Sequence, residues 1–484
     1  MKLLFAASEM FPLIKTGGLA DVAHSLPNAL AELGVDVRVV IPAYRTVLDR
    51  LTQMRVLGWL KLSAGTEVRI LEAMHPEMKM PLWLVDAPTA FDRVGDPYTG
   101  ANQQDWPDNP TRFALLSEAA ASLAMDGLSL GWQADAVHAN DWQTGLLPAY
   151  LSVETQPPRT VFTVHNIAYD CQFDFGTFQS LHLPAHWWSM ELGEFYGRFS
   201  MLKAGLMFSD VLTTVSPRYA DEIRTPEYGY GYAPILSAVS DKLVGILNGI
   251  DDITWNPRTD KHLVAHYQAG GKVRAGKRAN RQALLTAMGA SEEVIQQPVP
   301  LIGSVGRLVY QKGIDLLLDA IPPLLERTNA KFVLIGTGEA KLMHQLEALS
   351  KTHPDRVFSH LGYSETLAHQ LEAGCDIFAM PSRYEPCGLN QMYSLCYGTP
   401  PVVRETGGLA DTVVDATPRS IARGEANGFV FTEPTTHALQ AAIERALELF
   451  EQPKQWMKLI KTGMRAEYGW KQSAQAYLDV YGAD

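Results

Sequence analysis

The sequence has 484 residues, of which 46% are hydrophobic and 19% are charged, and its formal net charge at pH 7 is −12. One hydrophobic core rarely serves more than roughly 250–300 residues, so we expect at least two lobes. The excess of acidic residues opposes binding to nucleic acid or to an anionic membrane surface, whereas a neutral polymer substrate is compatible with it. No apolar run approaches the roughly 18 residues of a membrane span.

The N-terminal segment Met1–Ala7 ends in a short apolar run, which Ser8 and Glu9 follow at once. This pattern predicts a buried first strand, because the apolar region of a signal peptide is longer. The four cysteines form no CxxC pair and are too few for a disulfide framework: Cys171, Cys375, Cys387 and Cys396. They favour reduced thiols and a cytoplasmic protein.

Short β-branched or apolar runs then alternate with longer amphipathic stretches along the chain. The predicted strands cover residues 37–41, 82–85, 134–138, 160–165, 211–215, 301–305, 331–335, 376–380 and 401–404. The predicted helices include residues 21–33, 111–125, 314–327 and 436–450. Such alternation is typical of α/β proteins, in which helices cover both faces of parallel sheets.

A turn at residues 247–251, followed by a polar segment rich in Lys, Arg and Gly, predicts the boundary between the lobes. We therefore expect an N-terminal lobe at residues 1–247 and a C-terminal lobe at residues 248–455. The last segment, residues 456–484, has helical periodicity and is too short to form a domain. We expect it to pack back on the first lobe.

The hexapeptide TGGLAD occurs twice, at Thr16–Asp21 and at Thr406–Asp411, each time after a predicted strand. Glycines let a ligand approach the backbone closely, and a helix N-terminus favours a phosphate. We therefore predict an anion-binding task shared by both copies, with a positive charge from Lys15 before the first. The alternative is that both turns merely begin helices.

Two clusters in the second lobe point to the same chemistry. Arg307 and Lys312 lie five positions apart across a strand end, where two cations would stabilise a leaving diphosphate. Glu385 precedes a Pro-Cys-Gly turn that would hold its carboxylate for sugar hydroxyls. The alternatives are two solvated basic residues and a helix-capping acid. No His neighbours Cys387 in sequence, so we do not expect a nucleophilic thiol there.

In the first lobe, polar residues follow two predicted strands, in His138–Trp142 and in Thr163–Asn166. Open α/β sheets bind ligands at the carboxyl ends of their strands, so Asp141 and His165 are candidates for such a site. A lone His is more often a core residue, and only the repetition of polar clusters at two strand ends favours a functional interpretation.

Seven motifs occur in the order found in bacterial glycogen synthases and plant starch synthases: KTGGLAD, HxxDW, TVHN, LNGID, GRLxxQKG, RYEPCGL and the second TGGLAD. The sequence resembles this family over essentially its whole length. The resemblance implies a GT-B fold with two Rossmann-like lobes and retaining transfer of glucose. It further implies ADP-glucose as donor and glycogen or a maltooligosaccharide as acceptor.

The resemblance also implies roles for individual residues. Those expected to take part in catalysis are Asp141, His165, Arg307, Lys312 and Glu385. The other expected substrate contacts are Lys15, Gly18, Tyr98, Asn248, Gly336, Tyr363, Cys387, Gly388, Leu389, Thr406, Gly407 and Gly408. Two positions depart from related enzymes. The loop after Tyr169 continues Asp170-Cys171, and Tyr393 stands where other retaining enzymes carry a second Glu.

No carboxylate in the sequence stands out as the nucleophile of a double displacement, so substitution on the same face of the sugar is the expected course. The sequence has no DxD triplet, and we expect no metal and no cofactor. Pyridoxal-dependent phosphorolysis on a related architecture remains the alternative chemistry. A non-catalytic glucan-binding protein is the other alternative, and the presence of Arg307, Lys312 and Glu385 favours an enzyme.

Overall fold

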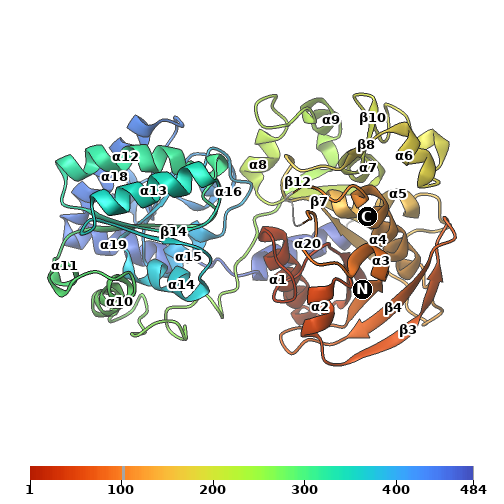
Figure 1. Ribbon diagram of the computed structural model, residues 1–484, viewed down its shortest axis with the longest axis horizontal. Helices are drawn as coiled ribbons and strands as arrows, with labels where there is room; N and C mark the ends of the chain where they lie inside the picture. Colours follow the sequence, from red (N-terminus) through yellow and green to blue (C-terminus); the bar gives the residue numbers. More distant parts are fainter. Residues whose placement is uncertain (101–103, 483–484) are drawn as a thin grey trace. The chain divides into compact units, whose positions relative to one another are not determined.

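The computed structural model describes residues 1–100 and 104–482, which divide into two α/β units (Figure 1). The first unit comprises Met1–Gly249 and the chain from Trp470 onward, and the second comprises Ile250–Gly469. The chain therefore returns to the first unit at residue 470. Our predicted boundary at residue 456 is wrong. The reason is that α19 (Pro453–Arg465) buries Trp456, Leu459 and Ile460 in the core of the second unit.

The first unit contains a nine-stranded sheet in the order β12-β11-β7-β6-β1-β2-β5-β4-β3. Its strands are β1 (Lys2–Ala6), β2 (Asp36–Pro42), β3 (Met54–Lys61), β4 (Glu67–Ala73), β5 (Leu82–Asp86), β6 (Ala136–Asn140), β7 (Arg159–Val164), β11 (Val211–Thr214) and β12 (Leu243–Gly245). The expectation of parallel sheets is wrong for β3 and β4, which pair antiparallel with each other and with β5. The connection between β3 and β4 is a short turn, and a parallel crossover needs a dozen residues or more.

The helices of this unit are α1 (Gly18–Glu32), α2 (Arg45–Arg50), α3 (Pro88–Phe91), α4 (Asn109–Ala124), α5 (Leu147–Leu151), α6 (Phe175–Ser180), α7 (Met201–Phe208), α8 (Pro217–Glu222), α9 (Ala233–Ala238) and α20 (Lys471–Gly482). A small antiparallel sheet is formed by β8 (Gln172–Phe173), β10 (Arg198–Ser200) and β9 (Glu194–Phe195). Asp170, which differs from the residue expected in related enzymes, has a structural role next to this small sheet. Its carboxylate accepts the backbone N–H of Leu202 at 3.0 Å.

The last helix of the chain completes the core of the first unit. His138 in β6 is fully buried, and its Nδ1 lies 2.7 Å from the hydroxyl of Tyr481 in α20. Its Nε2 lies 2.6 Å from Oγ1 of Thr163 in β7, and the centroid of its ring lies 5.2 Å from that of Tyr477. Burial holds the pKa of His138 well below its usual range. His138 is thus the core histidine that the sequence left as an alternative.

The second unit contains a six-stranded sheet in the order β15-β14-β13-β16-β17-β18, and all neighbouring strands are parallel. The strands are β13 (Leu301–Val305), β14 (Lys331–Gly336), β15 (Val357–Leu361), β16 (Ile377–Met380), β17 (Pro401–Arg404) and β18 (Phe429–Phe431). The helices are α10 (Val273–Ala287), α11 (Glu292–Gln296), α12 (Ile314–Arg327), α13 (Ala340–Thr352), α14 (Glu365–Gly374), α15 (Asn390–Cys396), α16 (Gly407–Thr412), α17 (Pro418–Arg423), α18 (Thr436–Phe450) and α19.

Helices cover both faces of this sheet, as the near-continuous apolar strands require. Successive residues of a strand point to opposite faces. Phe332 and Leu334 of β14 accordingly join one core cluster with α12, α13 and α18, whereas Val333 and Ile335 join another with α10, α11 and α14. Figure 1 shows α12 on one side of β14 and α10 and α14 on the other. Among the described residues, no helix is both long and apolar enough to cross a membrane.

Candidate functional site

The predicted residues of the second unit follow the carboxyl ends of five parallel strands. Tyr363 comes two residues after β15, Gly336 ends β14, and Arg307 comes two residues after β13. Glu385 follows β16, and Thr406 follows β17. Because parallel strands end at one edge of a sheet, the structure brings these positions to the edge where α/β proteins bind ligands.

Lys312 and Glu385 form an ion pair at this edge. Lys312 Nζ lies 2.5 Å from Oε2 of Glu385, which also accepts the hydroxyl of Ser382 at 3.0 Å. Glu385 is 5% exposed. A buried carboxylate needs such partners, since ionised groups are costly to remove from water. The pair places one cation and one anion, from separate strand ends, beside each other.

Arg307 and Tyr363 are exposed side chains of the same edge. Among the described residues, the side chain of Arg307 makes one hydrogen bond, to Oε1 of Gln311 at 3.4 Å. The ring of Tyr363 is 78% exposed, a large aromatic surface for a single residue. Cys387 is a free thiol and is buried, and Leu389 directly precedes α15. All four cysteines of the chain are free thiols.

The glycines of this edge serve close packing of backbone on backbone. A Cβ at Gly336 would lie 1.9 Å from the carbonyl oxygen of Gly306, and a Cβ at Gly408 would lie 2.1 Å from that of Cys387. Gly388 has a φ of 74° and would meet Gln391 at 2.5 Å. The amide of Gly408 already donates to the carbonyls of Glu385 and Pro386, both at 3.2 Å. This contact holds the Glu385 turn against α16.

The two TGGLAD copies therefore differ. Replacing Gly407 with Ala places a Cβ 1.9 Å from the carbonyl oxygen of Glu385, at a φ of 44°, whereas a Cβ at Gly17 or Gly18 meets nothing within 4 Å. We expect Gly407→Ala to lower the free energy of unfolding by about 2–4 kcal/mol. Urea unfolding measures this change, with Gly17→Ala as the matched control. Equal stability of the two variants would contradict the packing role of Gly407.

In the first unit, Asp141 and His165 follow β6 and β7 and contact each other. The backbone N–H of His165 donates to Oδ1 of Asp141 at 2.7 Å. Asp141 has a φ of 56°, a conformation uncommon outside glycine that clusters at functional sites. The side chain of Asn140 donates to the carbonyl of Ala6 at 3.0 Å, and its Oδ1 lies 2.9 Å from Nε2 of His165. These contacts tie together the ends of β1, β6 and β7.

Burial controls the protonation of both side chains. Desolvation raises the pKa of Asp141 to about 7 and lowers that of His165 to about 3. His165 is therefore neutral. Because Oδ1 of Asn140 can only accept, Nε2 carries the proton and Nδ1 is left as a hydrogen-bond acceptor. A neutral His beside a carboxyl group that titrates near pH 7 suits contacts with uncharged sugar hydroxyls.

The remaining predicted contacts of the first unit are Lys15, Gly18, Tyr98 and Asn248. Lys15 Nζ is paired with Oδ1 of Asp21 at 2.8 Å, and Gly18 is the first residue of α1. The hydroxyl of Tyr98 lies 2.7 Å from Oγ of Ser8 and 3.0 Å from Oε1 of Glu9. Asn248 is 6% exposed, and its Oδ1 is buried without a hydrogen-bond partner in the described part of the chain.

Glu9 is the residue that the sequence analysis missed. It lies three residues after the end of β1 and is 3% exposed. Burial raises its pKa, and its charge contributes to the raised pKa of Asp141. The rule that selected Asp141 and His165, polar residues directly after a buried strand, would also have selected Glu9.

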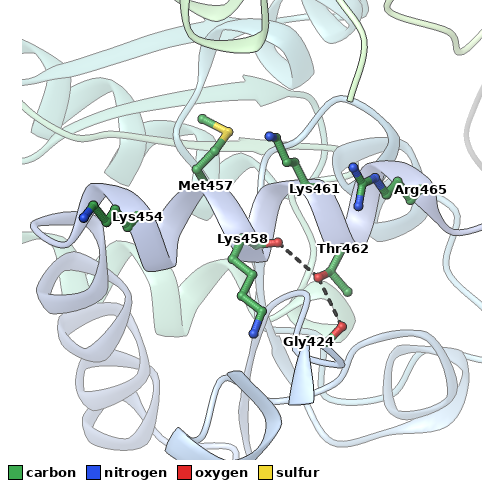
Figure 2. Close-up of a pocket in the computed structure, with 7 residues that line it drawn as sticks. All are labelled: Gly424, Lys454, Met457, Lys458, Lys461, Thr462 and Arg465. Carbon is green, nitrogen blue, oxygen red and sulfur yellow. Dashed lines mark hydrogen bonds between the residues drawn. The ribbon is translucent and has the colours of Figure 1, made fainter. Parts of the chain in front are cut away.

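A surface pocket on α19 contains none of the predicted residues (Figure 2). Its lining residues are Gly424, Lys454, Met457, Lys458, Lys461, Thr462 and Arg465. Lys458 donates to the carbonyls of Ile421 and Ala422 at 2.6 and 3.0 Å, and Figure 2 shows its side chain on the opposite side of α19 from that of Lys461. The cations do not converge on one point.

Comparisons with known proteins agree with this arrangement. A family model described as "Starch synthase catalytic domain" matches residues 2–238, and one described as "Glycosyl transferases group 1" matches residues 290–462. The chain is 49% identical over 489 residues to the glycogen synthase of Hydrogenovibrio crunogenus and covers 100% of both chains. It is 49% identical over 486 residues to the glycogen synthase of Thioalkalivibrio sulfidiphilus, with 99% of each covered.

Among solved structures, the chain is similar to the catalytic domain of starch synthase IV from Arabidopsis thaliana bound to ADP and acarbose. The TM-score is 0.88 at 32% identity, with 99% of this chain and 98% of that chain covered. A sucrose-phosphate synthase from Thermosynechococcus elongatus, at 17% identity and a TM-score of 0.57, shares the fold.

These similarities and the two α/β units define a glycosyltransferase of the GT-B fold, which confirms the predicted fold and enzyme class. The chain belongs to the glycogen synthase family.

Proposed function

We propose that the chain transfers glucose from ADP-glucose to the non-reducing end of an α-1,4-glucan, either glycogen or a maltooligosaccharide, with retention of anomeric configuration. The observation that carries the proposal is the assembly of Arg307, Lys312 and Glu385 at one strand edge of the second unit. The similar starch synthase IV is bound to ADP and to the oligosaccharide acarbose, which supports the donor and the acceptor class.

In this proposal the second unit binds the nucleotide sugar. Arg307 and Lys312 would neutralise the charge that grows on the diphosphate as the bond to glucose breaks. Glu385 would accept hydrogen bonds from glucose hydroxyls, and its pairing with Lys312 would hold both groups ready. The exposed ring of Tyr363 would pack on the adenine, and the turns at Gly336, Gly388 and Gly407 would keep the backbone close to the ligand.

The first unit would contact the sugar. Nδ1 of neutral His165 would accept a hydrogen bond from one sugar hydroxyl, and Asp141 would form a hydrogen bond with a second hydroxyl. We propose substitution on one face of the glucose. The acceptor hydroxyl oxygen bonds to the anomeric carbon as the bond to the diphosphate oxygen breaks, and the acceptor's proton passes to the leaving phosphate. No protein nucleophile takes part in this course.

Parallel assays with the two common donors test the proposal. Radiolabelled ADP-glucose and UDP-glucose are each incubated with glycogen, and label in the polymer is measured. We expect incorporation from ADP-glucose to exceed that from UDP-glucose, and proton NMR of the product to show α-linked residues. Equal or greater incorporation from UDP-glucose would contradict the donor assignment, and a β-linked product would contradict retention.

Transfer should survive chelation of divalent metals. The sequence has no DxD triplet, and in residues 1–100 and 104–482 no three His, Cys, Asp or Glu side chains form a group that could hold a metal ion. Lys and Arg would serve the phosphates instead. We expect the rate in excess EDTA to stay within about twofold of the untreated rate, since organic cations supply the charge. Loss of transfer in EDTA that Mg²⁺ restores would contradict this prediction.

We also place the reaction in the cytoplasm. The support is the set of four free cysteines, which is expected of a protein that remains in a reducing compartment.

A further inference from the structure

We propose that Glu9 is a positioning residue for glucose transfer, because its buried carboxylate joins the turn at residues 15–18 to Tyr98. The inference rests on the proposed function and on the expectation from the family resemblance that Lys15, Gly18 and Tyr98 contact the substrates. Glu9 itself need not touch a substrate. It would act by holding two separate groups of contact residues in one arrangement.

The first part of the network fixes the turn before α1. Oε2 of Glu9 accepts the backbone N–H of Thr16 at 2.5 Å and that of Gly17 at 3.2 Å. The hydroxyl of Thr16 donates to the same carboxylate, at 2.9 Å from Oε1 and 3.0 Å from Oε2. One carboxylate therefore binds three donors of two consecutive residues, and the turn that carries Lys15 and Gly18 has little freedom to rotate.

The second part fixes a residue 89 positions further along the chain. The hydroxyl of Tyr98 donates to Oε1 of Glu9 at 3.0 Å and lies 2.7 Å from Oγ of Ser8. The ring of Tyr98 packs near Phe113 and Trp142, at centroid distances of 6.0 and 6.1 Å. Its position thus depends on the ring packing and on the Glu9 carboxylate together.

A side chain that served only to cap α1 would be expected at the N-cap position itself. Ser, Thr, Asp or Asn at the N-cap normally satisfies the first amides of a helix. Here the N-cap is Gly17, which has no side chain to cap with, and the amides of Thr16 and Gly17 are satisfied from Glu9. Among the described residues no ion pair offsets the burial of this carboxylate, which is costly.

This arrangement keeps one side of the turn open. A Cβ at Gly17 or Gly18 would meet nothing within 4 Å, so a ligand can approach the glycines there. It also revises the role predicted for the first TGGLAD copy. The amides of Thr16 and Gly17 are committed to Glu9, and the anion-binding role passes to Gly18 and Lys15.

The test compares Glu9→Gln with wild type in three measurements. An amide of the same size keeps one acceptor oxygen but turns an NH2 group toward donors. We expect kcat with ADP-glucose and glycogen to fall about 10- to 100-fold, as small misplacements of contact residues do. The Kd for ADP, measured by calorimetry, should change less than kcat does, because Arg307 and Lys312 of the second unit would still bind the diphosphate. Hydrogen exchange in peptides covering Thr16 and Gly17 should become faster.

Matched variants separate positioning from folding. Glu222→Gln, a buried carboxylate of α8 outside the network, should leave kcat unchanged. Tyr98→Phe and Thr16→Val each remove one part of the network. When either is combined with Glu9→Gln, the fold decrease in kcat should be smaller than the product of the two single decreases. These two single variants also test the network if Glu9→Gln does not fold.

Three results would overturn the proposal: unchanged kcat in Glu9→Gln, exchange at Thr16 and Gly17 that does not change, or a loss of activity matched by an equal loss of folded protein. Failure of the proposed function has a different signature. Wild type would then incorporate no glucose from ADP-glucose, while the exchange measurement would still decide whether Glu9 holds the turn.

Discussion

Arg307→Ala and Lys312→Ala should each lower kcat for glucose transfer by about 100- to 1,000-fold, equivalent to about 3–4 kcal/mol, with a much smaller change in the KM for ADP-glucose. The reason is that charge on the leaving diphosphate grows toward the transition state, so its cationic partners act there preferentially. Steady-state kinetics with varied ADP-glucose at saturating glycogen separates the two parameters.

The two variants differ in what else they disturb. Lys312→Ala leaves the buried carboxylate of Glu385 without its ion pair, and we expect a loss of about 3 kcal/mol in the free energy of unfolding. Among the described residues, the side chain of Arg307 makes only the 3.4 Å hydrogen bond with Gln311, so Arg307→Ala should unfold as wild type does. Lys351→Ala, a surface cation of α13, is the control for charge alone. Near-normal kcat in both site variants would refute their assignment to the diphosphate.

Asp141→Asn should lower kcat/KM by about 100-fold or more and at the same time stabilise the protein above pH 7. The pKa of Asp141 is raised to about 7, so the native state binds this proton more tightly than the unfolded state does. Between the ordinary pKa of an aspartate and pH 7, the unfolded chain has already ionised while the native carboxyl keeps its proton, so stability falls as the pH rises and the loss is complete above pH 7. Asparagine keeps an oxygen for the N–H of His165 and does not ionise.

Urea unfolding at pH 5.5 and pH 8 measures this linkage. We expect the gain of the variant over wild type to be about 2 kcal/mol larger at pH 8 than at pH 5.5. Asp86→Asn is the matched control, because the Asp86 carboxylate is buried in an ion pair with Arg69 and its loss should destabilise the protein at both pH values. A variant that is less stable than wild type at pH 8 would contradict the raised pKa of Asp141.

Apolar patterning predicted most of the fold, because parallel strands buried on both faces form runs that are easy to recognise. The prediction failed for segments whose pattern does not show which other segment they pair with or pack against. Met54–Lys61 and Glu67–Ala73 contain charged residues and form an antiparallel hairpin at the sheet edge. Helix α19 has an apolar face that would suit either unit, and only the structure shows that this face packs in the second.

The candidate site was predictable where a strand end is followed by a distinctive motif. Asp141 and His165 were found in this way, and they contact each other. Glu9 directly follows the predicted first strand and was open to the same rule, but its contact with Tyr98, 89 positions further along the chain, depends on tertiary structure that no motif shows. The repeat was recognised, but its two copies could not be distinguished. Open space at Gly17 and tight packing at Gly407 depend on neighbouring backbone that no motif specifies.

Because Tyr477 and Tyr481 of α20 pack on His138, the core of the first unit stays incomplete until α20 has been translated. The second unit is one continuous segment, Ile250–Gly469, and all of its core residues leave the ribosome before α20 does. At about 5–20 residues per second, synthesis of that segment takes roughly 10–45 s. The second unit can therefore fold first, although its codons come later, and the partly built first unit exposes apolar surface to chaperones in the meantime.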